Sequence, residues 1–284
     1  MTDAGKILCT VLIISLGIGR IEAAEPVSEE TLGLLKTFVQ EFIEVTPGEG
    51  KYPATFQMGG DPKFPSEQKL REVAMREPFA MAKYEVPQNL YEAVTGANPS
   101  RWKGPRNSAE MMTQQEAVDF CRKLTQLLRQ QKQLPENQEI RLPTEAEWEY
   151  CCRAGTETAY SFGPKAQADE DKSPKASLLD PFAWHTGNAA GNDPPVGALK
   201  PNPWGFYDMH GYLWEYCSEK GAAEDTRYDD ATKSQSKITF VIRGGSWQDP
   251  YPLLRSSSRL AFGAEARSPA VGFRCVRSTV KQQD

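Results

Sequence analysis

The stretch from Val241 to Arg259, VIRGGSWQDPYPLLRSSSR, joins a pair of glycines to serine, aromatic and arginine side chains. This mixture is typical of a shaped polar surface, because glycine permits tight turns while the other side chains supply hydrogen bonds and flat apolar faces. The stretch contains one carboxylate, Asp249, and neither cysteine nor histidine. It therefore has the outline of a functional site without a thiol or an imidazole to perform chemistry.

The whole chain has the composition of a globular protein rich in turns. Hydrophobic residues make up 39% and charged residues 25% of its 284 positions, which is ordinary for a soluble domain. The 22 glycines and 21 prolines predict many loops. The net charge is −5, and no cluster of lysine and arginine is present that could follow a phosphate backbone. We therefore expect no nucleic-acid partner.

Residues 1–24 have the pattern of a signal peptide. Lys6 precedes an uncharged run from Ile7 to Gly19, and Ala23 with Ala24 supplies small residues for cleavage. The run suits the core of a signal peptide and is shorter than the roughly 18 residues that a membrane span needs. We expect export to a periplasm, an extracellular space or a secretory lumen, with no membrane span after cleavage. An uncleaved anchor is the alternative.

Export changes how the cysteines are interpreted. An odd number of cysteines outside the reducing cytosol indicates some disulfide pairing and at least one remaining thiol. With two histidines and no CxxC pair in the chain, a zinc site is not expected. The cysteines that follow the predicted signal peptide are Cys121, Cys151, Cys152, Cys217 and Cys275.

After the signal peptide, the pattern predicts one amphipathic helix and then a single α+β domain. Apolar residues recur at helical spacing from Leu32 to Ile43. We assign this helix to residues 25–50 and interpret it as an extension packed on the domain, with a partner-binding helix as the alternative. The domain is assigned to residues 51–279 and a short tail to residues 280–284.

Local signals predict several elements inside the domain. Thr113 and Thr144 each precede a glutamate by three residues, which is the pattern of a capping box at a helix start. Pro87 and Gly96 have the positions expected at the start and end of another helix. The predicted strands cover residues 78–86, 237–243 and 272–277, and the predicted surface loops cover residues 164–176 and 219–237.

Four motifs then occur in an order that resembles the formylglycine-generating enzyme, or sulfatase-modifying factor, family. They are RLPTEAEWEY (141–150), NPWGFYDMHGYLWEYCSE (202–219), RGGSW (243–247) and GFRCVR (272–277). The resemblance covers about residues 52–278. It implies an α+β domain related to the C-type lectin fold, with little regular secondary structure.

The best-known members of this family oxidise a sulfatase cysteine to formylglycine, using oxygen and a copper ion held by two cysteine thiolates. The resemblance places Asp249 at the first of these cysteine positions and Tyr251 at or near the second, and residues 247–271 contain no cysteine. Carboxylate and phenol oxygens are hard ligands that do not replace thiolates for Cu(I). We therefore expect neither copper nor oxidase activity. An active formylglycine-generating oxidase is the alternative.

The same stretch is then expected to form a binding groove. A protein, a peptide or a glycan is the expected ligand class, by analogy with the fold alone, and a sulfatase is a candidate partner. A scaffolding protein that docks through its N-terminal helix is a further alternative. The candidate groove residues are Ser246, Trp247, Asp249, Tyr251 and Arg255.

The resemblance also implies a calcium site in the segment MHGYLWEY. The carbonyl groups of His210, Gly211 and Leu213 and the carboxylate of Glu215 would supply the hard oxygen ligands that calcium prefers. Tyr212 stands where family members usually have asparagine. The alternative is that Glu215 pairs with an arginine inside a packed loop.

A disulfide between Cys152 and Cys275 is implied in the same way, because both match positions that form a bridge in family members of oxidising compartments. Ser256 occupies the place of another bridge cysteine, so a second bridge is not expected. The alternative for Cys152 and Cys275 is a pair of buried thiols.

Overall fold

A computed structural model describes residues 27–190, 193–221 and 238–280 of the chain. The predicted signal peptide, most of the predicted loop at 219–237 and the last four residues lie outside the described residues. No helix in the described part is long and apolar enough to cross a membrane.

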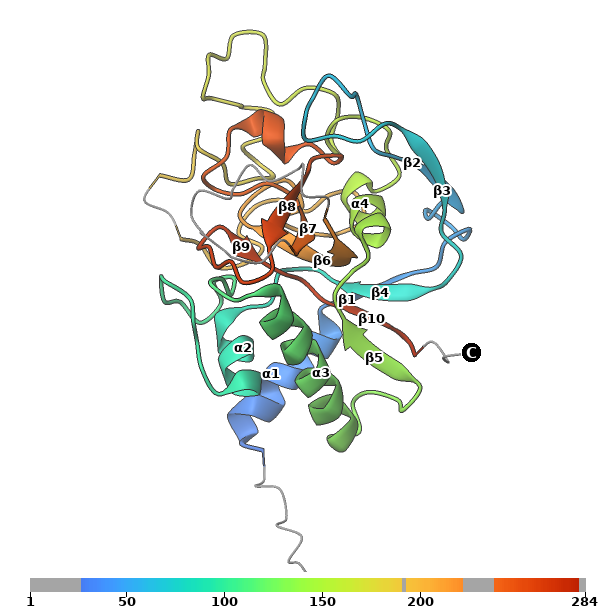
Figure 1. Ribbon diagram of the computed structural model, residues 1–284, viewed down its shortest axis with the longest axis vertical. Helices are drawn as coiled ribbons and strands as arrows, with labels where there is room; N and C mark the ends of the chain where they lie inside the picture. Colours follow the sequence, from blue (N-terminus) through green and yellow to red (C-terminus); the bar gives the residue numbers. More distant parts are fainter. Residues whose placement is uncertain (1–26, 191–192, 222–237, 281–284) are drawn as a thin grey trace, which may run out of the picture.

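Two four-stranded sheets and one strand pair form the framework of the described residues (Figure 1). One sheet has the strand order β1-β4-β10-β5, and all its neighbours are antiparallel. The other has the order β8-β7-β6-β9, in which β6 and β9 are parallel. The strands are β1 (Phe42–Val45), β2 (Thr55–Met58), β3 (Arg71–Ala74), β4 (Phe79–Ala82), β5 (Gln138–Arg141), β6 (Trp214–Lys220), β7 (Thr239–Arg243), β8 (Arg259–Gly263), β9 (Val271–Gly272) and β10 (Val276–Thr279).

Three helices begin directly after the residues that the sequence predicts as their start signals, Pro87, Thr113 and Thr144. At Thr113 and at Thr144 both hydrogen bonds of the capping box form, since each threonine side chain accepts from a glutamate N–H and that glutamate side chain accepts from the threonine N–H. Gly96 ends its helix with a φ of 85° in the left-handed region. The helices are α1 (Glu29–Gln40), α2 (Gln88–Thr95), α3 (Gln114–Gln130) and α4 (Glu145–Arg153), and a short 3-10 helix covers Tyr251–Leu254.

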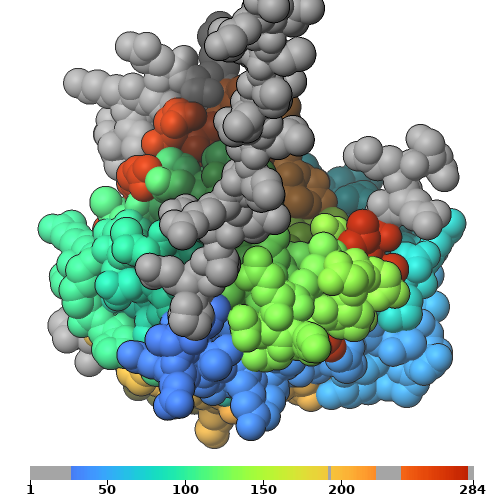
Figure 2. All heavy atoms as spheres, turned by 90° about the horizontal axis from the view of Figure 1, so that it is seen from below, coloured from blue at the N-terminus to red at the C-terminus, as the bar shows by residue number. Residues whose placement is uncertain are grey.

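The N-terminal helix α1 is part of the domain. Leu35 and Phe38 are buried in the same hydrophobic cluster as residues of α2 and α3. In the space-filling view, the blue surface of α1 lies directly against the green surfaces of neighbouring segments (Figure 2). The sequence predicted a helix over residues 25–50, but α1 ends at Gln40 and the chain continues from Phe42 as strand β1, which pairs with β4. The domain therefore begins before the predicted boundary at residue 51.

The core is divided into two large clusters. One lies between helices α1, α2 and α3 and the sheet that contains β6, and it includes Trp214 and Phe273. The other surrounds α4 and includes Trp148 and Trp204. The predicted loop at 164–176 contains neither helix nor strand. Between these elements, the loops that follow α2 and β7 approach one another and form the site described next.

Candidate ligand-binding site

A glycine turn starts the stretch that the sequence singled out. Gly244 and Gly245 have φ values of 104° and 78°, which side chains rarely adopt. A Cβ on Gly245 would also come within 2.7 Å of the Leu254 side chain. The two glycines are therefore required by the shape of the turn that ends β7.

Asp249 closes this turn from the inside. Its Oδ2 accepts hydrogen bonds from the backbone N–H of Ser246 at 3.0 Å, from the Ser246 hydroxyl and from Trp214 Nε1 at 2.8 Å. The side chain is buried, with 2% of the residue exposed. The residue that the resemblance places at a copper-binding position thus holds the turn together through these hydrogen bonds.

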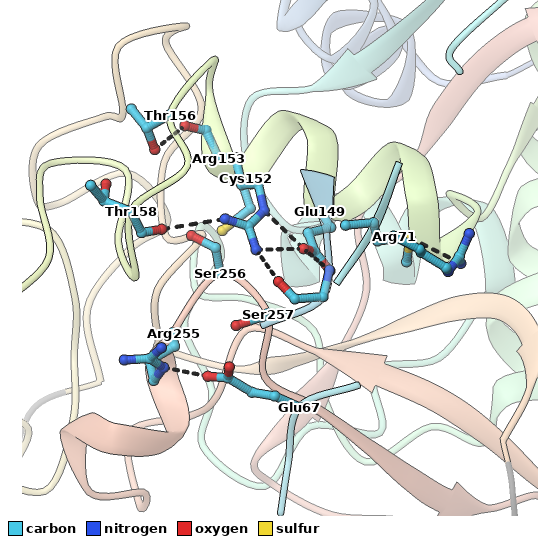
Figure 3. Close-up of polar contacts among 12 residues, drawn as sticks. Glu67, Arg71, Glu149, Cys152, Arg153, Thr156, Thr158, Arg255, Ser256 and Ser257 are labelled. Carbon is cyan, nitrogen blue, oxygen red and sulfur yellow. Dashed lines mark hydrogen bonds and ion pairs between the residues drawn. The ribbon is translucent and has the colours of Figure 1, made fainter. Parts of the chain in front are cut away.

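Tyr251 and Arg255 contact other segments. The Tyr251 hydroxyl donates to Gln167 Oε1 at 2.7 Å. Arg255 forms an ion pair with Glu67, drawn in Figure 3, and its guanidinium lies 4.3 Å from the ring centre of Phe64. Of the five predicted groove residues, Trp247 lines a cavity beside the turn, whereas the other four bond to neighbours within the protein.

A network of buried charges supports the stretch through the carbonyl groups of Ser256 and Ser257. Glu149 accepts from Arg153 Nε at 2.8 Å and from Arg243 (Figure 3 shows the Glu149–Arg153 pair). Arg243 also donates to the carbonyl oxygens of Ser256 at 2.8 Å and Ser257 at 3.1 Å. Rigid, forked guanidinium groups suit this task, since each can hold a carboxylate and a loop carbonyl together. This network therefore holds the loop at Ser256 and Ser257 against helix α4.

Trp247 leads to a cavity of about 250 Å³ beside the glycine turn. Its ring meets that of Trp102 edge to face, with ring centres 5.6 Å apart. The two indoles come from loops far apart in the sequence and form one wall together. The cavity is lined by Trp102, Ser108, Glu110, Ala189, Ala190, Asp193, Tyr212, Leu213, Trp247 and Pro269.

Glu110 is the most unusual polar residue of the cavity. The residue is 4% exposed, and its Oε1 accepts from the backbone N–H groups of Arg101 and Trp102, the latter at 3.4 Å. Its Oε2 has no hydrogen-bond partner among the described residues. Burial, and to a smaller extent the nearby Asp193, together raise the pKa of Glu110 to about 7, although the backbone hydrogen bonds from Arg101 and Trp102 and the charge of Lys103 lower it.

Tyr212 forms another part of the lining and has a strained backbone. Its φ is 92°, which is uncommon for any residue other than glycine and asparagine. Its hydroxyl donates to the carbonyl of Pro194 at 2.7 Å and accepts from the N–H of Ser108 at 3.2 Å. Backbone strain of this kind persists only where the surroundings enforce it, and it concentrates at functional sites.

The implied calcium site does not fit the residues present. Both oxygens of Glu215 accept from the Arg274 guanidinium, at 2.6 and 2.7 Å, and Oε2 also accepts from Trp148 Nε1 at 3.0 Å. The alternative, in which Glu215 pairs with an arginine, is confirmed. Across the residues that the structure describes, no group of three histidine, cysteine or acidic side chains is placed to hold a metal ion.

The other residues of the implied calcium loop are also committed to packing. His210 Nδ1 donates to the carbonyl of Leu254 at 2.9 Å, and its Nε2 accepts from the N–H of Ser161 at 3.0 Å. Burial lowers the pKa of His210 to about 4. Gly211 lies so close to the carbonyl oxygen of Trp184 that a Cβ would be 2.5 Å from it. The next two residues of this loop, Tyr212 and Leu213, line the cavity.

The predicted Cys152–Cys275 disulfide is wrong. The Cys275 sulfur lies 3.8 Å from that of Cys121, whereas Cys152 donates to the carbonyl of Met209 and lies beside Ser256 (Figure 3). Cys152 and Cys275 belong to different hydrophobic clusters. All five described cysteines are free and buried. Burial raises the thiol pKa of four of them: Cys151, Cys152, Cys217 and Cys275.

Comparison with known proteins assigns the fold to a family. The model of the sulfatase-modifying factor enzyme 1-like domain matches residues 36–279. The chain belongs to this family. The α+β fold expected from the resemblance is thereby confirmed. PvdO from Pseudomonas aeruginosa shares it with a TM-score of 0.62 and 26% identity, over 84% of this chain and 94% of that one.

Other relatives carry the names of a chaperone, a formylglycine-generating enzyme and an inactive enzyme. The chaperone protein LppX of Paenibacillus barcinonensis is 27% identical over 232 residues, which are 70% of this chain and 80% of LppX. The formylglycine-generating enzyme of Mycobacterium tuberculosis is 30% identical, over 49% of this chain and 52% of the enzyme. Inactive C-alpha-formylglycine-generating enzyme 2 of Bos taurus is also 30% identical, over 48% and 43%. The chain spans about half the length of these last two.

Sequence reasoning placed Trp247 in the site but missed most of the cavity. Trp102, Ser108 and Glu110 lie in the loop after α2, which no catalytic or metal-binding motif marks. The one available signal was Tyr212, where the family usually has asparagine. Asparagine tolerates a positive φ better than tyrosine does, so an aromatic residue at that position indicates a local requirement for its side chain.

Proposed function

We propose that this protein is an exported member of the sulfatase-modifying factor family that lacks oxidase activity and acts as a binding module. Its binding site is the cavity lined by Trp102, Glu110 and Trp247. A protein segment, a peptide or another ligand that carries a suitable small group is bound there. A sulfatase is one candidate partner, by family membership.

The observation that carries this proposal is the position of Asp249. The side chain that replaces a copper-binding thiolate is buried and accepts hydrogen bonds from Ser246 and Trp214. A copper oxidase also needs an accessible, deprotonated thiol, because the thiolate is the species that binds the metal. The five described cysteines are buried, and the four with raised thiol pKa values are poor sources of thiolate.

The cavity supports the binding half of the proposal. It combines apolar walls with a few buried polar groups, which is the usual construction of a ligand site. Aromatic residues with a polar edge, such as Trp102 and Trp247, are frequent in binding sites for the same reason. The relatives named as a chaperone and as an inactive enzyme are consistent with a family member that binds without oxidising.

Copper and peptide assays on one sample test the proposal. The reduced protein is titrated with Cu(I) and then incubated with oxygen and a sulfatase peptide that contains the target cysteine. An active formylglycine-generating enzyme serves as the positive control. We expect no stoichiometric thiolate-bound copper and no aldehyde. Aldehyde formation by this protein would establish the oxidase alternative instead.

A binding measurement tests the other half. The same sulfatase peptide, with its cysteine replaced by serine, is titrated into the protein and into the Trp247→Ala variant. If the cavity is the site, the variant binds any peptide ligand at least about tenfold more weakly, since an aromatic anchor commonly contributes 1.4 kcal/mol or more. Leu178→Ala, which removes an exposed side chain elsewhere, is the control and should bind like the original protein.

A further inference from the structure

The cavity contains a buried carboxylate oxygen that nothing in the described protein satisfies. Glu110 Oε2 has no hydrogen-bond partner there, and neither has the hydroxyl of Ser108 in the same lining. A buried acceptor without a partner destabilises the folded protein, and a charged one does so more strongly. Such a group in a native structure has a reason, and one such reason is a ligand that supplies the missing partner.

The charge of the lining is negative. Glu110 and Asp193 both contribute carboxylates, and the described lining includes no lysine and no arginine. Two cations flank Trp102 in the sequence: the Lys103 ammonium donates to the carbonyl of Asn98 at 2.7 Å, and the Arg101 guanidinium lies over the Trp102 ring at 5.0 Å from its centre. A ligand that enters the cavity therefore meets carboxylates that are not neutralised from within the lining.

The remaining walls are aromatic or apolar. Trp102, Trp247 and Tyr212 present rings, and Leu213 and Pro269 add aliphatic surface. The faces of aromatic rings attract cations, most strongly those of tryptophan, and a cation with alkyl substituents also buries apolar area against them. An anion would be repelled by the carboxylates. A purely apolar ligand would leave Glu110 Oε2 without a partner.

We propose that this cavity binds an alkylammonium group, a positive charge carried on a small apolar body, with Glu110 as its counter-ion and Trp102 and Trp247 as its aromatic wall. The inference rests on the proposed binding function and specifies its ligand chemistry. At about 250 Å³, the cavity suits one such group, because sites for whole drug-sized ligands occupy roughly 300–1,000 Å³. The group belongs either to a free small molecule or to a side chain of a bound protein.

A metal ion does not suit the same place. A hard cation such as calcium takes six or more oxygen ligands, whereas the side chains of the lining offer two carboxylates, the Ser108 hydroxyl and the Tyr212 phenol among aromatic and aliphatic groups. Asp193 Oδ2 already accepts from the Asn107 side-chain amide at 2.6 Å. An organic cation makes fewer demands, since it needs one counter-ion and the faces of rings.

The experiment compares a cation with a neutral molecule of similar shape. Tetramethylammonium and tert-butanol are titrated separately into the full protein by calorimetry, at about pH 8, where Glu110 is ionised according to its pKa of about 7. Asp193 and Lys103 are the other charged groups that act on this pKa. We expect tetramethylammonium to bind at least about tenfold more tightly than tert-butanol.

Two variants assign the effect to the named residues. Glu110→Gln keeps an oxygen to accept from Arg101 and Trp102 but removes the charge, so the preference for the cation should fall to about twofold or less. Trp102→Leu should weaken cation binding about three- to tenfold. Glu136→Gln is the matched control, because the Glu136 side chain is 86% exposed and distant from the cavity lining.

The source of the group is decided by a second pair of probes. A peptide that carries trimethyllysine is compared with the same peptide carrying norleucine, which is its neutral counterpart. Preference for the trimethyllysine peptide over both norleucine and free tetramethylammonium identifies a protein ligand. Preference for free tetramethylammonium identifies a small molecule. Either result supports the inference.

Two results would overturn it. If tert-butanol binds as tightly as tetramethylammonium, the cavity is an apolar site, and the proposed binding function survives without its ligand class. If no cation probe binds at all, the alkylammonium assignment is wrong, while copper and peptide assays decide the proposed function separately. Should Glu110→Gln fail to fold, lowering the pH of the original protein from about 8 to about 5.5 protonates Glu110 and must remove the preference instead.

Discussion

The buried carboxylate of Asp249 accepts a hydrogen bond from the indole Nε1 of Trp214 at 2.8 Å and ties the glycine turn to the start of β6. Asp249→Ala would leave this indole and the Ser246 N–H without their acceptor. We expect the free energy of unfolding to fall by roughly 3 kcal/mol, and Asp249→Asn to cost less, since the amide oxygen still accepts. Denaturant titration measures both.

Asp169→Ala is the control for Asp249, because the Asp169 side chain is 93% exposed and should change the stability by less than about 0.5 kcal/mol. A loss at Asp249 no larger than at Asp169 would contradict the structural role of that carboxylate.

The contact between Cys121 and Cys275 predicts which disulfide forms. Their sulfur atoms are 3.8 Å apart and their positions are 154 residues apart, so a bridge would stabilise the fold by about 5 kcal/mol in the chain-entropy model. Oxidised glutathione should take two electrons and two protons from this pair. Peptide mapping by mass spectrometry should then find Cys121 linked to Cys275. A link between Cys152 and Cys275 would show that the packing described here is wrong.

The raised pKa of Glu110 predicts a stability that falls with rising pH. Unfolding restores the ordinary pKa of 4.5, so between about 4.5 and about 7 the folded protein holds a proton that the unfolded chain has lost. Raising the pH through this window therefore costs stability, by up to about 3 kcal/mol. Glu110→Gln has no ionisable group at this position, so the variant should be more stable than the original protein at about pH 8.

Paired unfolding curves of the original protein and Glu110→Gln at several pH values check this prediction. Glu85 and Asp208 also have raised pKa values, but they are present in both proteins, so their contribution cancels in the difference. Parallel pH profiles would exclude a buried, protonated Glu110.

The Glu215–Arg274 pair predicts a large cost for removing one partner. Both side chains are fully buried, and Glu215→Gln would remove the paired carboxylate from Arg274, with Glu85 and Asp208 as the other acidic groups that act on it. We expect a loss of roughly 3–5 kcal/mol. Glu136→Gln, which disrupts an exposed pair with Arg129, should cost less than about 1 kcal/mol.

Calcium provides an independent measurement at the same residue. Because Arg274 occupies both carboxylate oxygens of Glu215, millimolar calcium should not raise the midpoint of thermal unfolding. A calcium-dependent increase that Glu215→Gln abolishes would restore the calcium site.

The sequence predicted those features that depend on neighbours in the chain. The capping boxes at Thr113 and Thr144 need one turn of helix, and the turn at Gly244 needs a backbone that glycine adopts. Each of these features depends on only a few neighbouring residues, so distant packing has little effect on it.

Predictions that depended on distant packing succeeded less often. The partner of Cys275 is decided by how β10 passes α3, which no local pattern records. The polar groove residues were expected to face a ligand, but Ser246 and Asp249 satisfy each other. The sequence did not predict the cavity, because Glu110 and Trp247 come together only in the folded chain. No sequence motif links the two loops that carry them.

The enclosure of the thiols gives this protein a natural means of following its own motions. Cys151 and Cys217 are fully enclosed in the core around α4, so an alkylating reagent reaches them when that region opens. The rate of labelling then reports how often this part of the core opens, and no cysteine has to be introduced for the measurement. Comparing the labelling rates with and without a bound ligand would measure how much binding in the cavity reduces the opening of the core around α4.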